Sequence, residues 1–153
     1  MASAQASSVI FERADVTIES PPSTDKEPKP SHPTLKYSVE SRPEDALRLE
    51  YIHTLNGLTA DTGVLIVFDA PSMVPLPAMK VYTPVDALFI ADDGTVVQIL
   101  PNVVLGDITQ EIKAREPVKA FFFIKAGEAA MRNIHPRDTV SGKMFAIAPP
   151  VQQ

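Results

Sequence analysis

Cysteine is absent from the 153 residues of this chain. Its absence excludes disulfide bonds, thiol catalysis and every zinc site that uses thiolate ligands. Histidine is scarce as well, because His32, His53 and His135 are the only three and none has a paired carboxylate or a histidine four residues away. We therefore expect no bound metal and no cofactor.

The chain also lacks a basic stripe and a long hydrophobic run. It carries 14 Lys and Arg against 19 Asp and Glu, a net charge of −5, whereas binding to a phosphate backbone requires a basic footprint. No apolar run approaches the roughly 20 residues that span a bilayer, and the first residues do not have the pattern of a secretory signal. We expect a soluble protein synthesised in the cytoplasm, with no nucleic acid or membrane as partner.

Proline, in contrast, is frequent near the N-terminus. Five prolines punctuate the segment ESPPSTDKEPKPSHPT: Pro21, Pro22, Pro28, Pro30 and Pro33. Such a segment favours a stiff, extended linker. The preceding stretch VIFERADVTIE, residues 9–19, has the β-branched and aromatic content of one or two short strands. The sequence thus predicts an extended N-terminal arm, residues 1–33, followed by a single β domain, residues 34–153.

The domain itself shows the pattern of short strands. Alternation predicts a strand at residues 35–40, and continuous apolar runs predict buried strands at residues 63–70 and 118–125. Asp92-Asp93-Gly94 lies between two further apolar runs and predicts a hairpin turn. Because oxygen ligands do not recur at alternate positions after it, this turn is not a calcium loop. Phe121, Phe122 and Phe123 should belong to a core or interface strand with alternate side chains strongly buried.

Helices should be few and short in this domain. Ser41 and Glu44 have the spacing of a capping box, which predicts a helix from about Arg42 to before Asn56-Gly57. An Ala-rich stretch after residue 125 predicts a second short helix, and residues 144–148 predict a last strand. We expect a mainly β fold, a β-sandwich or jelly roll with one or two short helices.

Several ordered blocks resemble the uncharacterised DUF192 family. They are RPEDAL, GVLIVFDAP, PVDALFIADDGTVVQI and KAGEAAMRNIHPRDTV, and the likeness covers roughly residues 35–140. The resemblance implies a small β-rich, jelly-roll-like domain and no agreed activity. Family members usually carry Trp and then Met-Lys-Asn-Thr before the Pro-x-Asp element. This chain keeps Met79 and Lys80 but has Pro77 and Ala78 before them, and Val81 and Tyr82 after them.

Lys80 and Asp86 are the candidate ligand-binding residues, and two interpretations of them are open. In one, they line a pocket for an anionic or polar ligand, which the changes at Val81 and Tyr82 would alter. In the other, which we favour, they mark the edge of a sheet. Asp86 should then accept backbone amides at the start of a strand, and Lys80 should be exposed or at a contact.

No Gly-x-Ser-x-Gly elbow, phosphate loop or other catalytic motif is present, so we expect no enzymatic activity. The sequence favours a structural or assembly module whose arm adds a strand to a neighbouring subunit. Its protein partners would form a homo-oligomer or larger assembly, and decoration of a virus capsid, with localisation in the virion, is one concrete form. The candidate interface residues are Val9, Ile10, Phe11, Val16 and Ile18. The alternative is a cellular small-ligand-binding domain of the DUF192 type with an altered pocket.

Overall fold

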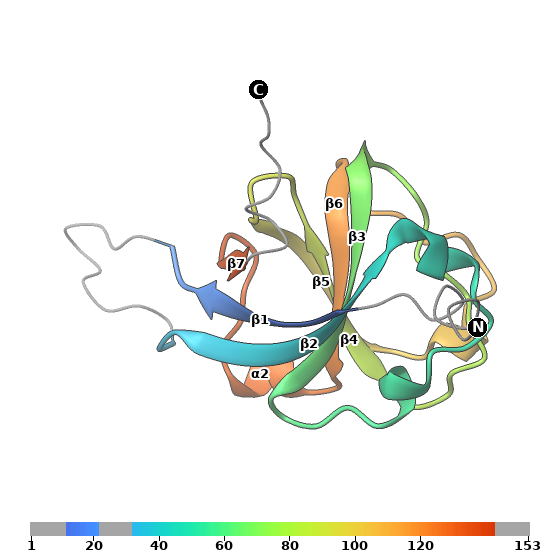
Figure 1. Cartoon of the computed structure of the whole chain (residues 1–153), viewed down its shortest axis with the longest axis horizontal. Coiled ribbons are helices and arrows are strands. Elements are labelled where there is room, and N and C mark those ends of the chain that lie inside the picture. Colours follow the sequence, from blue (N-terminus) through green and yellow to red (C-terminus); the bar gives the residue numbers. More distant parts are fainter. Residues whose placement is uncertain (1–11, 22–31, 143–153) are drawn as a thin grey trace, which may run out of the picture.

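The computed structural model describes residues 12–21 and 32–142 of the chain (Figure 1). These residues form a mainly β domain, as the sequence predicts. Its strands are β1 (Glu12–Glu19), β2 (Leu35–Pro43), β3 (Thr62–Ser72), β4 (Val85–Ile90), β5 (Val96–Val103), β6 (Val118–Lys125) and β7 (Thr139–Gly142). The short helical elements are η1 (Glu44–Arg48), η2 (His53–Asn56), η3 (Leu105–Asp107) and α2 (Glu128–Met131).

One curled sheet contains all seven described strands, in the order β5-β4-β6-β3-β2-β1-β7. β2 and β3 are parallel, whereas the other neighbouring pairs are antiparallel. The two outer strands meet at one end, where Thr95 bridges Thr139. The amide of Val140 donates to the carbonyl of Gly94 at 2.8 Å, and the amide of Val96 donates to the carbonyl of Asp138 at 2.8 Å. The sheet is therefore closed on itself at this end, which limits its free edges.

β1 lies in the sheet of its own domain, which differs from the predicted arm of residues 1–33. It runs between β2 and β7, with Val16 opposite Tyr37 on one side and Gly142 on the other. Val16 and Ile18, two of the candidate interface residues, are buried in the interior of the curled sheet. The apolar alternation predicts the strand correctly, but it does not tell which sheet buries these side chains. Val9, Ile10 and Phe11 lie outside the described residues.

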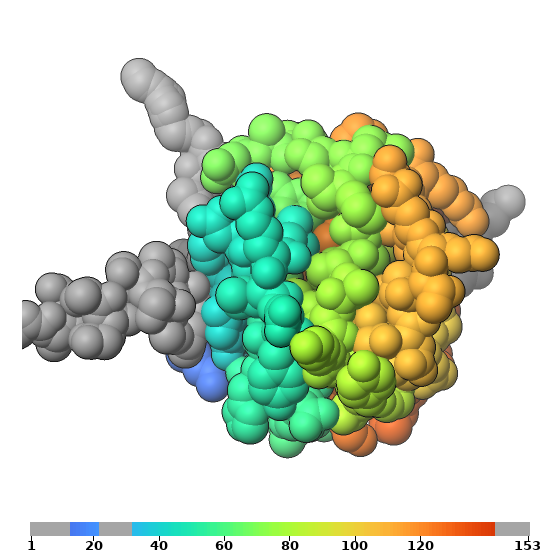
Figure 2. All heavy atoms as spheres, turned by 90° about the vertical axis from the view of Figure 1, so that its right-hand side faces the viewer, coloured from blue at the N-terminus to red at the C-terminus, as the bar shows by residue number. Residues whose placement is uncertain are grey.

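The two faces of the sheet bury separate apolar clusters. The inner cluster fills the curled sheet and includes Tyr37, Leu65, Leu88 and Phe122. The outer cluster lies under a layer of loops, residues 44–58, 73–84 and 104–117, and includes Phe68 and Phe121. Figure 2 shows this loop layer from outside, with the blue-green, green and orange segments side by side. We call it the loop face.

The strand β6 confirms the prediction for the three consecutive phenylalanines, and it buries all three rings completely. Phe122 points into the inner cluster, whereas Phe121 and Phe123 point into the outer one. Phe122 meets the Tyr37 ring edge-on at a centroid distance of 5.7 Å. Because β6 is covered on both faces, its sequence is a continuous apolar run instead of an alternating one.

The helix predicted from Arg42 does not form. β2 continues through Pro43, which pairs with Val67 of β3, and the 3-10 turn η1 starts only at Glu44 without a side-chain cap. Glu44 instead accepts the amide of Asp69. Ser41 lies in β2 opposite Leu65 of β3. Because it is part of a strand, it cannot act as the N-cap residue of a helix. The last strand predicted at residues 144–148 lies outside the described residues.

The Asp92-Asp93-Gly94 turn connects β4 and β5, as predicted, and closes the sheet. Gly94 has a φ of +91°, and a Cβ at this position would lie 2.6 Å from the carbonyl oxygen of Val140. Gly127 offers a matched comparison, because its φ is +92° but a Cβ there would have no atom within 4 Å. The two glycines thus share the conformational requirement and differ in the space around them.

Gly94→Ala should destabilise the fold more than Gly127→Ala. Gly127→Ala should cost about 1–2 kcal/mol, the strain of a side chain in the left-handed region, and Gly94→Ala should add the displacement of β7. Urea unfolding of both variants measures the difference. Equal losses of stability would contradict the close contact between the turn and β7.

Candidate functional site

Asp86, the second residue of β4, is completely buried and is held by backbone amides. Its Oδ1 accepts the amide of Asn102 at 3.0 Å, and its Oδ2 accepts the amides of Gly127 at 3.1 Å and Ala129 at 3.0 Å. These donors come from the end of β5 and from the start of α2. The carboxylate therefore satisfies amides of distant segments, which is a structural role.

Lys80 lies apart from this buried carboxylate, on the loop face. Its side chain is 72% exposed, and its Nζ lies 3.4 Å from Oε1 of Glu50, whose side chain is 79% exposed. Met79 and Val81 on either side are buried in the outer cluster. Lys80 and Asp86 therefore do not share a cavity. Asp86 accepts backbone amides and Lys80 is exposed, as predicted, but neither residue marks a sheet edge. β4 lies between β5 and β6, and Lys80 is in a loop.

Asp86→Ala should destabilise the protein by about 3–5 kcal/mol, because it leaves three buried amides without an acceptor. Lys80→Ala should change the stability by no more than about 0.5 kcal/mol, since it removes an exposed ion pair. Chemical denaturation of both variants tests the contrast. A mild effect of Asp86→Ala would show that the amides find other acceptors.

A second buried polar cluster connects β2, α2 and the segment before β3, and sequence patterns alone do not predict it. The hydroxyl of Tyr37 donates to Oε1 of Glu128 at 3.1 Å. Arg132 contacts the same oxygen at 2.9 Å and Oδ1 of Asp61 at 2.9 Å, and its guanidinium lies 5.3 Å from the centre of the Tyr37 ring. The one sequence signal of this cluster is the spacing of Glu128 and Arg132, four residues apart.

This cluster reaches the surface at a hollow of ≈ 580 Å³ lined by Asp15, Thr34, Leu35, Lys36, Ser38, Asp61 and Arg132. The charges that line it are already paired, because Asp61 binds Arg132 and Asp15 lies 4.0 Å from Lys36. Burial, together with the nearby Glu128 carboxylate, raises the pKa of Tyr37, and Arg132 partly offsets the effect. The cluster therefore holds α2 against β2 through hydrogen bonds and ion pairs. Each charged side chain that lines the hollow already has a partner of opposite charge.

The raised pKa of Tyr37 makes the stability depend on alkaline pH. In the unfolded chain a tyrosine loses its proton near pH 10, whereas the folded protein resists this loss. The contribution of Tyr37 is thus complete below about pH 10 and is lost as the pH rises further. Between pH 9 and pH 11 the wild type should lose roughly 1 kcal/mol more of its unfolding free energy than Tyr37→Phe does. Urea unfolding at each pH measures the unfolding free energy of both proteins. If this free energy changes with pH in the same way in both, the Tyr37 hydroxyl is not buried in its uncharged form.

His32 and Asp138 form a third buried pair, between residues that the sequence places in a linker and a turn. His32 Nε2 lies 2.7 Å from Asp138 Oδ2, and His32 Nδ1 lies 2.6 Å from the carbonyl oxygen of Pro33. Asp138 Oδ2 also accepts the amide of His135. A His-Asp pair is typical of general-base catalysis, in which one ring nitrogen faces the substrate. In this pair both ring nitrogens of His32 are hydrogen-bonded within the protein. The pair fastens the segment before β2 to the turn before β7.

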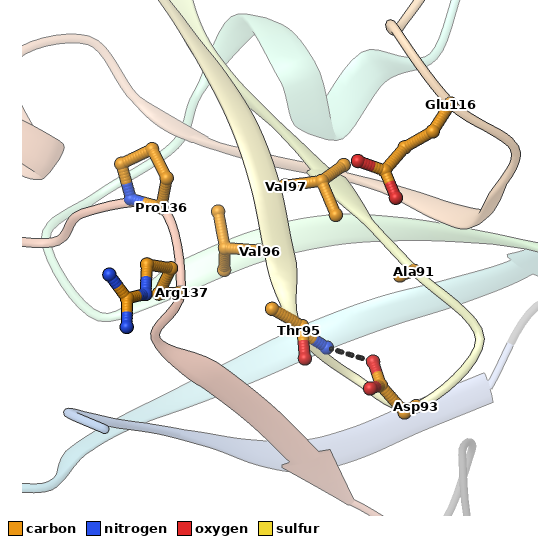
Figure 3. A pocket seen from close by; sticks show the side chains of 8 residues that line it. All are labelled: Ala91, Asp93, Thr95, Val96, Val97, Glu116, Pro136 and Arg137. Atoms are coloured by element: carbon orange, nitrogen blue, oxygen red, sulfur yellow. Dashed lines mark hydrogen bonds between the residues drawn. The ribbon is translucent and has the colours of Figure 1, made fainter. Parts of the chain in front are cut away.

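A hollow of ≈ 330 Å³ beside β5 is shown in Figure 3, and its charged side chains do not converge. Pro136 and Arg137 lie on one side of the strand in this view, whereas Glu116 and Asp93 lie on the other. Asp93 accepts the amide of Thr95 at 3.0 Å, and this hydrogen bond lowers the pKa of the Asp93 carboxyl group. The arrangement does not assemble a nucleophile with a base.

Metal-binding clusters and membrane-spanning helices are both missing from the described part of the chain. Among residues 12–21 and 32–142, no three His, Asp or Glu side chains come together in a way that could hold a metal ion. Within the same ranges, no helix has the length and apolar character needed to cross a bilayer.

The loop face carries a patch of exposed apolar and charged side chains that sequence patterns do not reveal. Tyr82 is 62% exposed and Tyr51 is 43% exposed, and Leu49 is exposed as well. The Lys80 amide donates to the Glu50 carbonyl at 2.6 Å, which fixes the two segments against each other. We call Leu49, Glu50, Tyr51, Lys80 and Tyr82 the loop-face patch.

Backbone contacts make this patch a defined surface. The amide of Gly106 donates to the carbonyl of Val81 at 2.9 Å, and Gly106 lies so close to the Tyr82 ring that a Cβ there would overlap it. Thr83 donates a hydrogen bond to Asn56, which ties residues 44–58 to residues 73–84 again. Tyr82 is therefore exposed on one side and supported on the other, an arrangement that suits a binding surface.

Comparisons with known proteins agree with this fold. The model of the DUF192 family, described as an uncharacterized ACR, matches residues 29–142. The crystal structure of a candidate transcription regulator from Sinorhizobium meliloti has a TM-score of 0.69 and 27% identity, covering 88% of this chain and 96% of that chain. A protein of unknown function from Novosphingobium aromaticivorans has a TM-score of 0.65 and 22% identity, covering 83% of each chain. No curated protein matches the chain at a significant level.

Proposed function

The chain belongs to the DUF192 family, and we propose that this member is a non-enzymatic assembly module that self-associates through the loop-face patch. The observation that carries the proposal is the exposure of Tyr82 and Tyr51 on a supported backbone. Large apolar side chains with substantial exposure are few among the described residues, and three of the five lie in this patch: Leu49, Tyr51, Met73, Tyr82 and Met131.

The chemistry of the patch supports protein binding. Tyrosine is enriched at the centre of protein interfaces because its ring buries a large apolar area while its hydroxyl keeps a polar partner. Glu50 and Lys80 beside the rings supply a polar rim. Because Met79, Val81 and Ile52 anchor the segments in the outer cluster, little conformational entropy is lost when the patch is covered.

The proposal keeps the assembly role but moves the contact from the arm to the loop face, since β1 is paired within its own domain. Decoration of a virus capsid is one form of such assembly and requires a further contact with a shell protein. The relative from Sinorhizobium meliloti is described as a candidate transcription regulator. A regulatory role for this chain would act through protein contacts, because its net charge of −5 opposes contact with DNA.

The alternative, a small-ligand-binding domain with an altered pocket, has less support. The pocket interpretation needs polar groups to converge near Lys80 and Asp86, but the neighbours of Lys80 in the chain, Met79 and Val81, are buried in the outer apolar cluster. Asp86 has both oxygens bound by backbone amides.

Replacing the two exposed rings should abolish self-association. We expect the wild type to sediment as an oligomer and the double variant Tyr51→Ser, Tyr82→Ser to sediment as a monomer, with both proteins folded by circular dichroism. Met131→Ser is the matched control, because Met131 is 73% exposed but lies at the end of α2, outside the patch. An unchanged mass of the double variant would refute the proposed surface.

A further inference from the structure

We propose that the loop-face patch binds the same patch of a second copy across a two-fold axis, so that Lys80 of each copy pairs with Glu50 of the other. This inference rests on the proposed function and adds the geometry of the contact. It predicts a closed dimer instead of an open chain of subunits, because an isologous contact uses the same surface of both partners.

The charges of the patch are the first argument. A two-fold contact requires a surface that is complementary to itself, so a charged surface of this kind must carry both signs of charge. The patch does so, with one cation at Lys80 and one anion at Glu50, both largely exposed. A partner of uniform charge would attract one of these groups and repel the other.

The spacing of the two charges is the second argument. The hydrogen bond between the Lys80 amide and the Glu50 carbonyl holds the two residues side by side. Their charged atoms are 3.4 Å apart within one copy, as an exposed pair that contributes little to folding. Exchanging this contact for a reciprocal one between copies therefore costs little, and two pairs form for each dimer.

The aromatic residues are the third argument. Tyr82 and Lys80 are exposed, whereas Met79 and Val81 in the same segment are buried. Tyr51 follows Glu50 directly in the chain. A two-fold axis that passes near the tyrosines, with Lys80 and Glu50 reaching across beside them, buries the rings of both copies in the middle of the contact, where apolar area is buried most completely.

Charge reversal tests the reciprocal contact. Lys80→Glu and Glu50→Lys should each raise the dimer dissociation constant by about tenfold or more, because each substitution turns two attractive contacts into repulsive ones. An equimolar mixture of the two single variants should dimerise again, since one copy then presents two acidic groups and the other two basic groups. The double variant carrying both reversals should also dimerise. Sedimentation velocity at low ionic strength measures all of these samples.

The control uses another exposed ion pair. Asp15 and Lys36 lie 4.0 Å apart on β1 and β2, with comparable exposure, so Asp15→Lys and Lys36→Glu should leave the mass of the dimer unchanged. Urea unfolding should show that all variants remain folded.

The outcomes separate this inference from the proposed function. If the tyrosine double variant is monomeric but mixing the two charge variants fails to restore the dimer, the two-fold geometry is refuted and assembly through the patch stands. If neither the tyrosine nor the charge variants change the mass, both are refuted. A wild type that is monomeric at the highest concentration measured would also overturn both.

Discussion

The carboxylate of Asp86 binds amides from three positions that are far from it in the chain: Asn102, Gly127 and Ala129. It thereby fixes the end of β5 and the start of α2 to the beginning of β4. α2 is too short to be stable alone, and Gly127 at its start has a left-handed backbone. The position of α2 then determines where Glu128 and Arg132 meet Tyr37. One buried acceptor thus sets the geometry of the polar cluster at this end of the sheet.

The other buried carboxylates of the described residues act in a similar way. Glu128 binds Tyr37 and Arg132, Asp138 binds His32, and Glu40 accepts hydrogen bonds from Arg42 and Thr54. Burying a charge is costly unless partners compensate it. At least one oxygen of each carboxylate is bound in this way, whereas Oδ1 of Asp138 is buried without a hydrogen-bond partner among the described residues. These groups would be candidates for catalysis by residue type alone. Their hydrogen bonds and ion pairs join segments of the fold that are distant in the sequence.

The sequence predicts well the features that depend on neighbouring residues. The Asp92-Asp93-Gly94 hairpin and the buried strand around Phe122 follow from turn chemistry and hydrophobic pattern. That Asp86 accepts backbone amides is also predicted, but its donors lie in distant segments and not in the proline-rich segment before β4. Contacts between distant segments are not predictable in this way. The pattern of β1 indicates a strand, but pairing with β2 and β7 depends on the whole sheet. His32 meets Asp138 across 106 positions, and no local signal marks either residue as a partner. Ser41 fails as a helix cap because β2 extends past it, and this extension is set by pairing with β3.

The departures from the family pattern at Val81 and Tyr82 lie next to each other in one loop segment and differ in exposure. Val81 points inward and replaces a polar side chain with apolar atoms that pack in the outer cluster. Tyr82 points outward and places a large ring on the surface, supported by Gly106. A single stretch thereby adds one apolar side chain to the outer cluster and one aromatic ring to the surface next to Lys80 and Glu50. Because Val81 is buried and Tyr82 is exposed, these two changes act on opposite sides of the segment. An apolar side chain inside and an exposed ring outside are therefore compatible with one fold.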